Sequence, residues 1–330
     1  MTSAADTVIQ LRDTLTATLG PLLPRGEPFA LLGYPAYANV GDSAIWLGAL
    51  ALLRRHGSGP PAYACTPRTF DEESLRQRVP RGTILFTGGG NFGDLYPSHQ
   101  RMRERVVAAF PEHRIVQLPQ TIRFANDRER EASRRSLGAH RDFTLLARDE
   151  ESLKVARCGL GLRASLCPDL AFALGPQPRL SPPTRDVLWL LRRDHEQLGG
   201  GGLGPGAADA RDWPAEPREA LFRLQRRLRK AVARSPQRHP RRDALLQRTF
   251  APAARARVRR GLALLASARV VVTDRLHGHI LATLLGIPHV FLDNSYGKNA
   301  TFHRAWTAHV DGVRWAEDAA DVAKLLEELR

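Results

Sequence analysis

The stretch RVVVTDRLHGHILATLLGIPHVFLDNSYGK, residues 269–298, holds an apolar run, a group of polar residues and a second apolar stretch. The β-branched residues at 270–273 predict a buried strand, residues 278–286 predict an apolar helix, and residues 288–294 predict another strand. Strand, helix and strand in this order form a βαβ unit, in which the two strands lie parallel in one sheet. The stretch therefore predicts an α/β fold with a mostly parallel sheet.

The same alternation of strands and helices extends over most of the chain. A Pro-rich segment at 175–186 interrupts it and is typical of a linker. We therefore expect an α/β fold of two Rossmann-like domains, residues 1–178 and 179–330, with a ligand cleft between them. Strands are expected at 28–34, 62–66, 82–90, 113–121, 142–149, 164–174, 186–194, 268–274 and 288–294. Helices are expected at 43–57, 127–137, from 150, in two segments before 268, at 278–286, after 298 and at 315–330.

The composition is that of an ordinary globular protein. Of its 330 residues, 43% are hydrophobic and 25% are charged, and no apolar run approaches the ~18 residues that a membrane span requires. The first 20 residues lack the apolar segment of a signal peptide, and the three cysteines lie far apart. We therefore expect a cytoplasmic, reduced protein without a structural disulfide or a zinc site.

The net charge of +15 comes mainly from arginine. It indicates either an attraction to phosphate-rich partners or a compositional preference for Arg, Ala, Gly and Pro. No nucleic-acid-binding motif accompanies the charge, so we expect no nucleic acid partner. The insertion at 198–216 is Gly-rich and is expected to be mobile. The basic stretch at 221–242 is either a solvated helix face or a peripheral contact with the anionic inner face of a membrane.

Polar residues follow the first predicted strand, in the position where parallel α/β sheets bind their ligands. Asn39, Gly41 and Asp42 stand there, just ahead of a predicted helix. Asp42 or Ser43 can cap that helix, because their side-chain oxygens accept hydrogen bonds from backbone N–H groups. The alternative is a tight polar turn that presents these side chains to a substrate.

A second polar group follows the strand expected at 82–90. The glycine triplet 88–90 lets the backbone approach a ligand closely, and Asn91 and Asp94 can bond the hydroxyls of that ligand. The spacing fits neither the dinucleotide-binding motif nor the P-loop. At a further strand end, Arg148 and Asp149 form either a salt bridge between the domains or part of the site.

Cationic residues stand at three strand ends of the C-terminal half. They are Arg192, Arg193, Arg275, His277 and Lys298. A helix that begins near His277 adds its N-terminal amides, so the group suits a small anion that carries phosphate and carboxylate. The structural alternative is a buried ion pair between Arg275 and either Asp274 or Asp293.

With these motifs in order, the chain resembles the polysaccharide pyruvyl transferases. The resemblance covers about residues 31–306 and rests on NVGDSAI, FTGGGNFGDLY, LPQTI, ARDEES, CPDLAFAL, LLRRD, TDRLHGHILATLLGIP and DNSYGKN. It implies a two-domain fold like that of the GT-B glycosyltransferases, with phosphoenolpyruvate as the donor and no cofactor. The implied product is a pyruvate ketal on a sugar of an exopolysaccharide, another cell-surface polysaccharide or a lipid-linked precursor.

The resemblance implies that Arg275, Leu276 and His277 contact the donor, and the chemistry of ketal formation leads to hypotheses for the roles of single residues. His277 is the predicted general acid, because imidazole titrates near neutrality. Arg275 is predicted to stabilise the departing phosphate, and Asp42 to orient or deprotonate the acceptor hydroxyl. The donor-binding residues are then Arg193, Arg275, Leu276, His277 and Lys298, and the acceptor-binding residues are Asn39, Asp42, Gly89, Gly90 and Asn91. No cluster of carboxylates or histidines has the spacing of metal ligands, so no metal is expected.

Two other functions stay open at this point. A GT-B glycosyltransferase that uses a nucleotide sugar would share the cleft and the basic pocket, although the sequence places no acidic residue convincingly for a ribose. A non-catalytic binder of anionic polymers would use the charge of +15, but it would leave the polar strand ends without a purpose.

Overall fold

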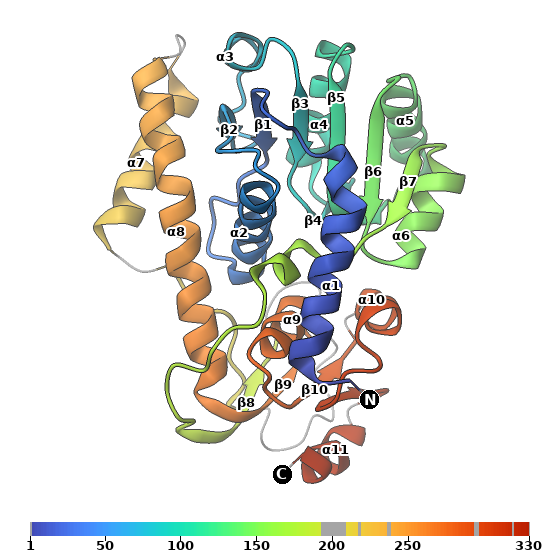
Figure 1. Ribbon diagram of the computed structural model, residues 1–330, viewed down its shortest axis with the longest axis vertical. Coiled ribbons are helices and arrows are strands. Elements are labelled where there is room, and N and C mark those ends of the chain that lie inside the picture. The colour runs from blue at the N-terminus through green and yellow to red at the C-terminus, as the bar shows by residue number, and fades with distance from the viewer. Residues whose placement is uncertain are drawn as a thin grey trace.

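The structure, a computed structural model, describes residues 2–192, 209–216, 219–235, 239–293, 297–318 and 320–329. Within these residues the strands form two sheets, and all the strand pairings in both sheets are parallel. In Figure 1 the seven-stranded sheet lies in the upper part of the molecule and the four-stranded sheet in the lower part. The predicted parallel α/β fold is confirmed.

The seven-stranded sheet has the order β2-β1-β3-β5-β6-β7, with β4 paired to the far part of β5. The chain changes direction across the sheet between β1 and β3, and such a switch point is where open α/β sheets bind ligands. The strands are β1 (Phe29–Leu32), β2 (Tyr63–Cys65), β3 (Thr83–Phe86), β4 (Gly89–Gly93), β5 (Arg114–Arg123), β6 (Phe143–Ala147) and β7 (Arg163–Leu166). The helices are α1 (Ala4–Leu19), η1 (Gly20–Leu22), α2 (Val40–Arg55), α3 (Glu72–Arg78), α4 (Pro97–Ala109), α5 (Asp127–Gly138), α6 (Glu150–Lys154), η2 (Val155–Gly159) and η3 (Leu170–Leu174).

The four-stranded sheet has the order β11-β10-β9-β8, so consecutive strands are neighbours. The strands are β8 (Arg185–Leu190), β9 (Ala268–Thr273), β10 (His289–Leu292) and β11 (Val313–Ala316). The helices of this half are α7 (Ala220–Arg234), α8 (Pro240–Ala266), α9 (Leu276–Leu284), α10 (Lys298–Trp306) and α11 (Asp321–Leu329). None of the helices in the described ranges offers an apolar stretch sufficient to cross a bilayer.

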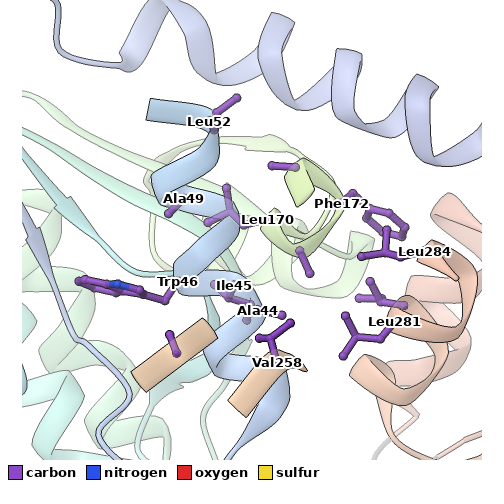
Figure 2. Close-up of a cluster of buried hydrophobic side chains, with 14 of the residues drawn as sticks. Ala44, Ile45, Trp46, Ala49, Leu52, Leu170, Phe172, Val258, Leu281 and Leu284 are labelled. Atoms are coloured by element: carbon purple, nitrogen blue, oxygen red, sulfur yellow. The ribbon is translucent and has the colours of Figure 1, made fainter. Parts of the chain in front are cut away.

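Helix α2 packs against elements of both halves of the chain. Its buried side chains meet Leu170 and Phe172 of η3, Val258 of α8 and Leu281 of α9 in one apolar cluster (Figure 2). The contact is close, because a Cβ atom on Gly48 of α2 would lie 1.9 Å from the carbonyl oxygen of Leu170. The N-terminus of α2 is thereby held at a defined position relative to α9.

Two long helices also run from one sheet to the other (Figure 1). Helix α1 packs against both η3 and α9, and Thr2, just ahead of it, forms a β-bridge with Val310. Helix α8 packs against both α2 and β9. These contacts bury apolar side chains between the two halves, and such burial is the main favourable term in folding.

Several element boundaries differ from the prediction. The segment 82–90 turns after Phe86 and resumes as the separate strand β4, since Gly89 adopts a positive φ of 127°. The segment 164–174 is extended only to Leu166, because Asp169 then caps the short helix η3. The helix expected at 315–330 begins only at Asp321, because residues at its start form strand β11 against β10.

A buried group of histidines comes from α9, β10 and α10. His279 Nδ1 lies 2.7 Å from His289 Nε2, and both rings are fully buried. Thr307 Oγ1 bonds both His279 Nε2 and His303 Nδ1, at 2.9 and 3.0 Å. Burial lowers the pKa of His289 and that of His303 to about 4, and lowers the pKa of His279 well below its ordinary value. The group is therefore neutral at pH 7.

We expect the protein to lose stability as the pH falls from 6.5 towards 4. Because the folded-state pKa values are depressed, the unfolded chain binds more protons in this window, so the free energy of unfolding falls as the pH falls. Burial raises the pKa of Asp274 to about 6. This shift makes the folded protein more stable as the pH falls, but it concerns one group, whereas three histidines act in the other direction. Thermal unfolding midpoints at pH 7.5, 6.5, 5.5 and 4.5 test this expectation, and a flat profile would contradict it.

Candidate functional site

A cavity of about 570 Å³ lies at the carboxyl ends of the strands. Its walls include residues that follow β1, β2, β3 and β6 of the larger sheet and β8 and β9 of the smaller one. The volume lies within the range of sites for small molecules. Both halves of the chain therefore contribute to one pocket.

His277 stands in the first turn of α9 at the wall of this cavity. Its ring packs on Gly41 of α2 so closely that a Cβ atom on Gly41 would lie 2.4 Å from Nδ1. On the other side, His277 Nε2 lies 3.6 Å from Asp169 Oδ2, and the side chain of His277 is only 13% exposed. The imidazole is thus held between the first turn of α2 and the carboxylate that follows β7.

Asp169 is the buried anion of the site. Its Oδ2 accepts a hydrogen bond of 2.7 Å from Arg148 Nη1, and its Oδ1 accepts one of 2.8 Å from the amide of Ala171. Burial raises the pKa of a carboxyl group, but here His277, Arg148 and the Ala171 amide outweigh it and hold the pKa of Asp169 below its ordinary value. Asp169 is therefore ionised beside His277.

Arg148 is fixed by several contacts at the end of β6. Its Nε donates to Thr121 Oγ1 at 2.8 Å, and its backbone oxygen accepts from Trp306 Nε1 at 2.8 Å. The side chain of Arg148 is 3% exposed yet lines the cavity. Asp149 points elsewhere, since it caps α6 and accepts from Thr121. Arg148 and Asp149 therefore do not form a salt bridge with each other, and Arg148 lines the pocket.

Arg275 is the N-cap residue of α9 and lines the same cavity. Its Nη2 pairs with Asp212 Oδ2 at 2.5 Å. The structural alternative for Arg275 was an ion pair with Asp274 or Asp293, whereas the Asp274 carboxylate accepts a hydrogen bond from the Arg192 amide at 2.9 Å. The partner Asp212 comes from the insertion at 198–216, which was expected to be mobile. Residues 209–216 of that insertion are placed, and they bring Asp212 to the pocket.

The polar residues at the start of α2 have two different roles. Asn39, rather than Asp42 or Ser43, caps the helix, since Asn39 Oδ1 accepts from the amide of Asp42 at 3.2 Å. The carboxylate of Asp42 instead accepts from the hydroxyl of Tyr37 at 2.8 Å, and both residues line the cavity. Asp42 therefore lines the cavity and does not cap the helix.

Strand β4, which follows the turn after β3, brings Gly90 and Asn91 to the cavity. Asn91 Oδ1 accepts from Arg103 Nη2 at 3.1 Å and from Gln120 Nε2 at 2.9 Å, so the amide plane is fixed from behind. A Cβ atom on Gly90 would lie 3.4 Å from Arg148 Nη2, an ordinary contact distance, so Gly90 and Arg148 are neighbours at the cavity wall. Asp94 is used differently from the prediction, because it accepts hydrogen bonds from the backbone amides at 125 and 126.

The structure brings most of the predicted site residues together. Those that line the cavity are Asn39, Asp42, Gly90, Asn91, Arg275, Leu276 and His277. Gly89 adjoins them, since a Cβ atom there would lie 3.6 Å from Asp42 Oδ1. Arg193 lies outside the described residues, as does the side chain of Lys298.

The site also contains residues that the sequence did not predict. Asp169 was visible only as part of the CPDLAFAL motif, and Tyr37, His99 and Trp213 carried no signal of their own. Burial lowers the pKa of His99 to about 4, so this ring is neutral at the cavity wall. Within the described ranges, no group of three or more His, Cys, Asp or Glu residues could hold a metal ion.

Comparison with known proteins connects this geometry to a family. Residues 39–296 match the model of the family described as polysaccharide pyruvyl transferase. The chain is 35% identical over 309 residues to Pyruvyl transferase 1 of Schizosaccharomyces pombe, an alignment that covers 89% of this chain and 74% of that relative. It is 31% identical over 319 residues to "Putative pyruvyl transferase EpsO" of Bacillus subtilis, with 95% of each chain covered.

A solved structure supports the fold. It is that of an uncharacterized protein, KP1_0663, from Klebsiella pneumoniae, with a TM-score of 0.59 over 94% of this chain and 98% of that chain, at 18% identity. This likeness bears on the fold alone. The family model and the two curated relatives bear on the family, because they cover most of the chain and each is described as a pyruvyl transferase, one of them as putative. The chain belongs to the polysaccharide pyruvyl transferase family.

Proposed function

We propose that the protein transfers the pyruvyl group of phosphoenolpyruvate to two hydroxyls of a sugar and forms a pyruvate ketal. The sugar belongs to an exopolysaccharide, another cell-surface polysaccharide or a lipid-linked precursor. The observation that carries the proposal is that Arg275, Leu276 and His277 line one cavity together with Asp42. The comparisons do not favour the alternative, a glycosyltransferase that uses a nucleotide sugar.

The donor lies at the cationic side of the cavity in this proposal. Arg148, Arg192 and Arg275 line that side, and α9 begins there with Arg275 as its N-cap residue. Phosphoenolpyruvate carries a phosphate and a carboxylate, which guanidinium groups bind through paired hydrogen bonds. Arg193 and Lys298 are proposed as further donor ligands. The proposal includes a GT-B-like division, in which residues 1–178 supply the acceptor-binding residues and residues 179–330 supply most of the donor-binding residues, with Arg148 added from the first half.

The reaction needs one proton at carbon and releases two from oxygen. His277 protonates the methylene carbon of phosphoenolpyruvate, so that C2 becomes electrophilic and a sugar hydroxyl attacks it. The C2–O bond to phosphate then breaks, with Arg275 stabilising the leaving group, and a neighbouring hydroxyl closes the ketal ring. Asp42 accepts the hydroxyl protons. One of these finally restores His277, and the other leaves with inorganic phosphate.

The direct test of the reaction uses purified protein, phosphoenolpyruvate and a panel of saccharides. We expect release of inorganic phosphate that depends on a saccharide, together with a new ketal methyl signal in the NMR spectrum of that saccharide. Thermal stabilisation by UDP or GDP but not by phosphoenolpyruvate would contradict the proposal and support a nucleotide-sugar enzyme.

Substitution Arg275→Gln tests the donor site. We expect the KM for phosphoenolpyruvate to rise at least about tenfold, since a charge-assisted hydrogen bond contributes roughly 1.5–3 kcal/mol. The matched control is Arg269→Gln in β9, where the side chain is 74% exposed and lies 3.7 Å from Asp186. An unchanged KM in Arg275→Gln would remove this residue from the donor site.

Substitution Gly41→Ala tests whether the position of the His277 ring matters. The new Cβ atom would overlap the imidazole, so the ring must move, and we expect kcat to fall at least about tenfold because small misplacements of reacting groups are costly. In the control Gly138→Ala, the nearest heavy atom to the new Cβ lies at 3.9 Å. A kcat equal to that of the wild type in Gly41→Ala would mean that the position of His277 is unimportant.

A further inference from the structure

A buried guanidinium stands behind strand β4 and has no anionic partner. Arg103 lies on α4 and is only 2% exposed, with its Cζ atom 4.3 Å from the centroid of the Phe92 ring. Among the residues that the structure describes, no carboxylate forms an ion pair with it. Burying a cation without an anion is costly, so packing alone does not explain an arginine at this position.

Three amide oxygens take the place of an anion around Arg103. Its Nε donates to Gln117 Oε1 at 2.7 Å, and its Nη1 donates to Gln100 Oε1 at 2.6 Å. Its Nη2 donates to Asn91 Oδ1 at 3.1 Å. Of these three partners, Asn91 lines the cavity. Asn91 is therefore the contact through which the buried guanidinium reaches the site.

The neighbours of Asn91 determine which end of its amide faces them. A guanidinium only donates hydrogen bonds, so the atom next to Arg103 must be the oxygen. Gln120 leads to the same result, because its Oε1 accepts from the backbone amide of Asn91 and its Nε2 donates to the carbonyl oxygen of Thr87, both at 3.3 Å. The same Nε2 donates to Asn91 Oδ1 at 2.9 Å. Both neighbours thus hold Oδ1, and Nδ2 is the end of the amide that is left for a ligand.

A hydrogen-bond donor at Asn91 complements the carboxylate of Asp42. Tyr37 occupies Oδ2 of Asp42, while Oδ1 would lie 3.6 Å from a Cβ atom on Gly89, two residues before Asn91 on β4. A hydroxyl group has one proton to donate and lone pairs that accept. A sugar hydroxyl that gives its proton to Asp42 therefore still needs a donor for its oxygen. The cation behind Asn91 polarises the amide and strengthens its N–H as that donor.

We propose that Arg103 is a positioning residue for the acceptor, and that it fixes Asn91 as a hydrogen-bond donor to a hydroxyl oxygen of the saccharide. The inference rests on the proposed function and adds to it the direction of this bond and a reason for the buried charge. Arg103 itself does not touch the substrate. The hydroxyl in question donates to Asp42 and accepts from Asn91.

Substitution Asn91→Asp tests the direction of the bond. Aspartate keeps an oxygen for Arg103 but replaces the N–H donor by a second acceptor, which cannot share the single hydroxyl proton with Asp42. We expect the KM for the saccharide to rise at least about tenfold, with little change in the KM for phosphoenolpyruvate. The new carboxylate also neutralises the guanidinium, so we expect a thermal unfolding midpoint no lower than that of the wild type.

The saccharide for these measurements is chosen from the methyl glycosides of glucose, galactose and mannose, as the one with the fastest phosphate release by the wild type. A wild-type KM for this saccharide in Asn91→Asp would overturn the inference, as would a lower unfolding midpoint. Failure of the proposed function would appear separately, as wild-type protein that neither binds phosphoenolpyruvate nor releases phosphate from it.

A double-mutant cycle tests whether Arg103 acts through Asn91. We expect Arg103→Gln to raise the KM for the saccharide at least about threefold in the wild-type background and to have no further effect in the Asn91→Ala background. Equal effects in both backgrounds would mean that Arg103 supports only the fold. The control is Arg105→Gln on the same helix, where the side chain is 60% exposed and pairs with Glu72, and wild-type kinetics are expected. If Arg103→Gln does not fold, Asn91→Asp decides alone, because it leaves the guanidinium in place.

Discussion

Replacing His277 by Gln is expected to abolish turnover while phosphoenolpyruvate still binds. Glutamine keeps much of the size and polarity of the ring but cannot deliver a proton to carbon, and a positioned general acid contributes roughly 10²–10⁴-fold to a rate. The guanidinium of Arg275 and the N-terminus of α9 stay in place to hold the donor. Phosphate release measures kcat, and calorimetry measures the dissociation constant of phosphoenolpyruvate.

The control for this substitution is His309→Gln, because His309 is exposed and lies outside the cavity wall. We expect wild-type kinetics in the control. Full activity of His277→Gln would exclude His277 as the general acid. Weaker binding of phosphoenolpyruvate with an unchanged kcat would mean that the imidazole binds the donor and does not protonate it.

Replacing Asp169 by Asn is expected to destabilise the protein and to lower kcat together. The side chains of Asp169 and Arg148 are 1% and 3% exposed, so the substitution leaves a buried guanidinium without its anion. Removing one partner of a buried ion pair costs about 3–5 kcal/mol. The neighbouring imidazole of His277 also loses the carboxylate that lies 3.6 Å from its Nε2. Denaturant unfolding gives the loss of stability, and steady-state kinetics gives kcat and KM.

A second variant separates the two effects of Asp169. Asp149 is also buried at the end of β6 and caps α6, but it bonds Thr121 and the amide of Ser152. We expect Asp149→Asn to lower stability by about 1 kcal/mol through the weakened cap and to leave kcat near the wild-type value. If Asp169→Asn loses stability but keeps the wild-type kcat at a temperature where it is folded, Asp169 supports the fold and does not position His277.

The pattern of apolar residues was sufficient to predict the parallel α/β fold. Short β-branched runs such as 270–273 alternate with helical segments, and the polar groups at strand ends then predict where a ligand binds. This reasoning found Asp42, Asn91, Arg275 and His277, which line one cavity. It worked because the carboxyl ends of parallel strands meet at one edge of a sheet, whatever the lengths of the connections.

The remaining site residues depend on contacts that no local pattern encodes. Asp212 reaches Arg275 from an insertion whose glycine content predicted mobility, and Arg229 comes from a basic helix that resembled a solvated surface. Gly41 was noted as part of a turn, but the ring of His277 that packs on it comes from the other half of the chain. Such pairs become visible only when α2 and α9 have been packed together.

The most direct test of the account is a titration of phosphoenolpyruvate into the wild-type protein and into the variant Arg275→Ala/His277→Ala, with folding of both checked by thermal unfolding. We expect the wild type to bind and the variant to bind at least tenfold more weakly, because the variant lacks both the donor's guanidinium ligand and its proton donor. Equal binding by two folded proteins would contradict the position of the donor site, and an absence of binding by the wild type would contradict phosphoenolpyruvate as the donor.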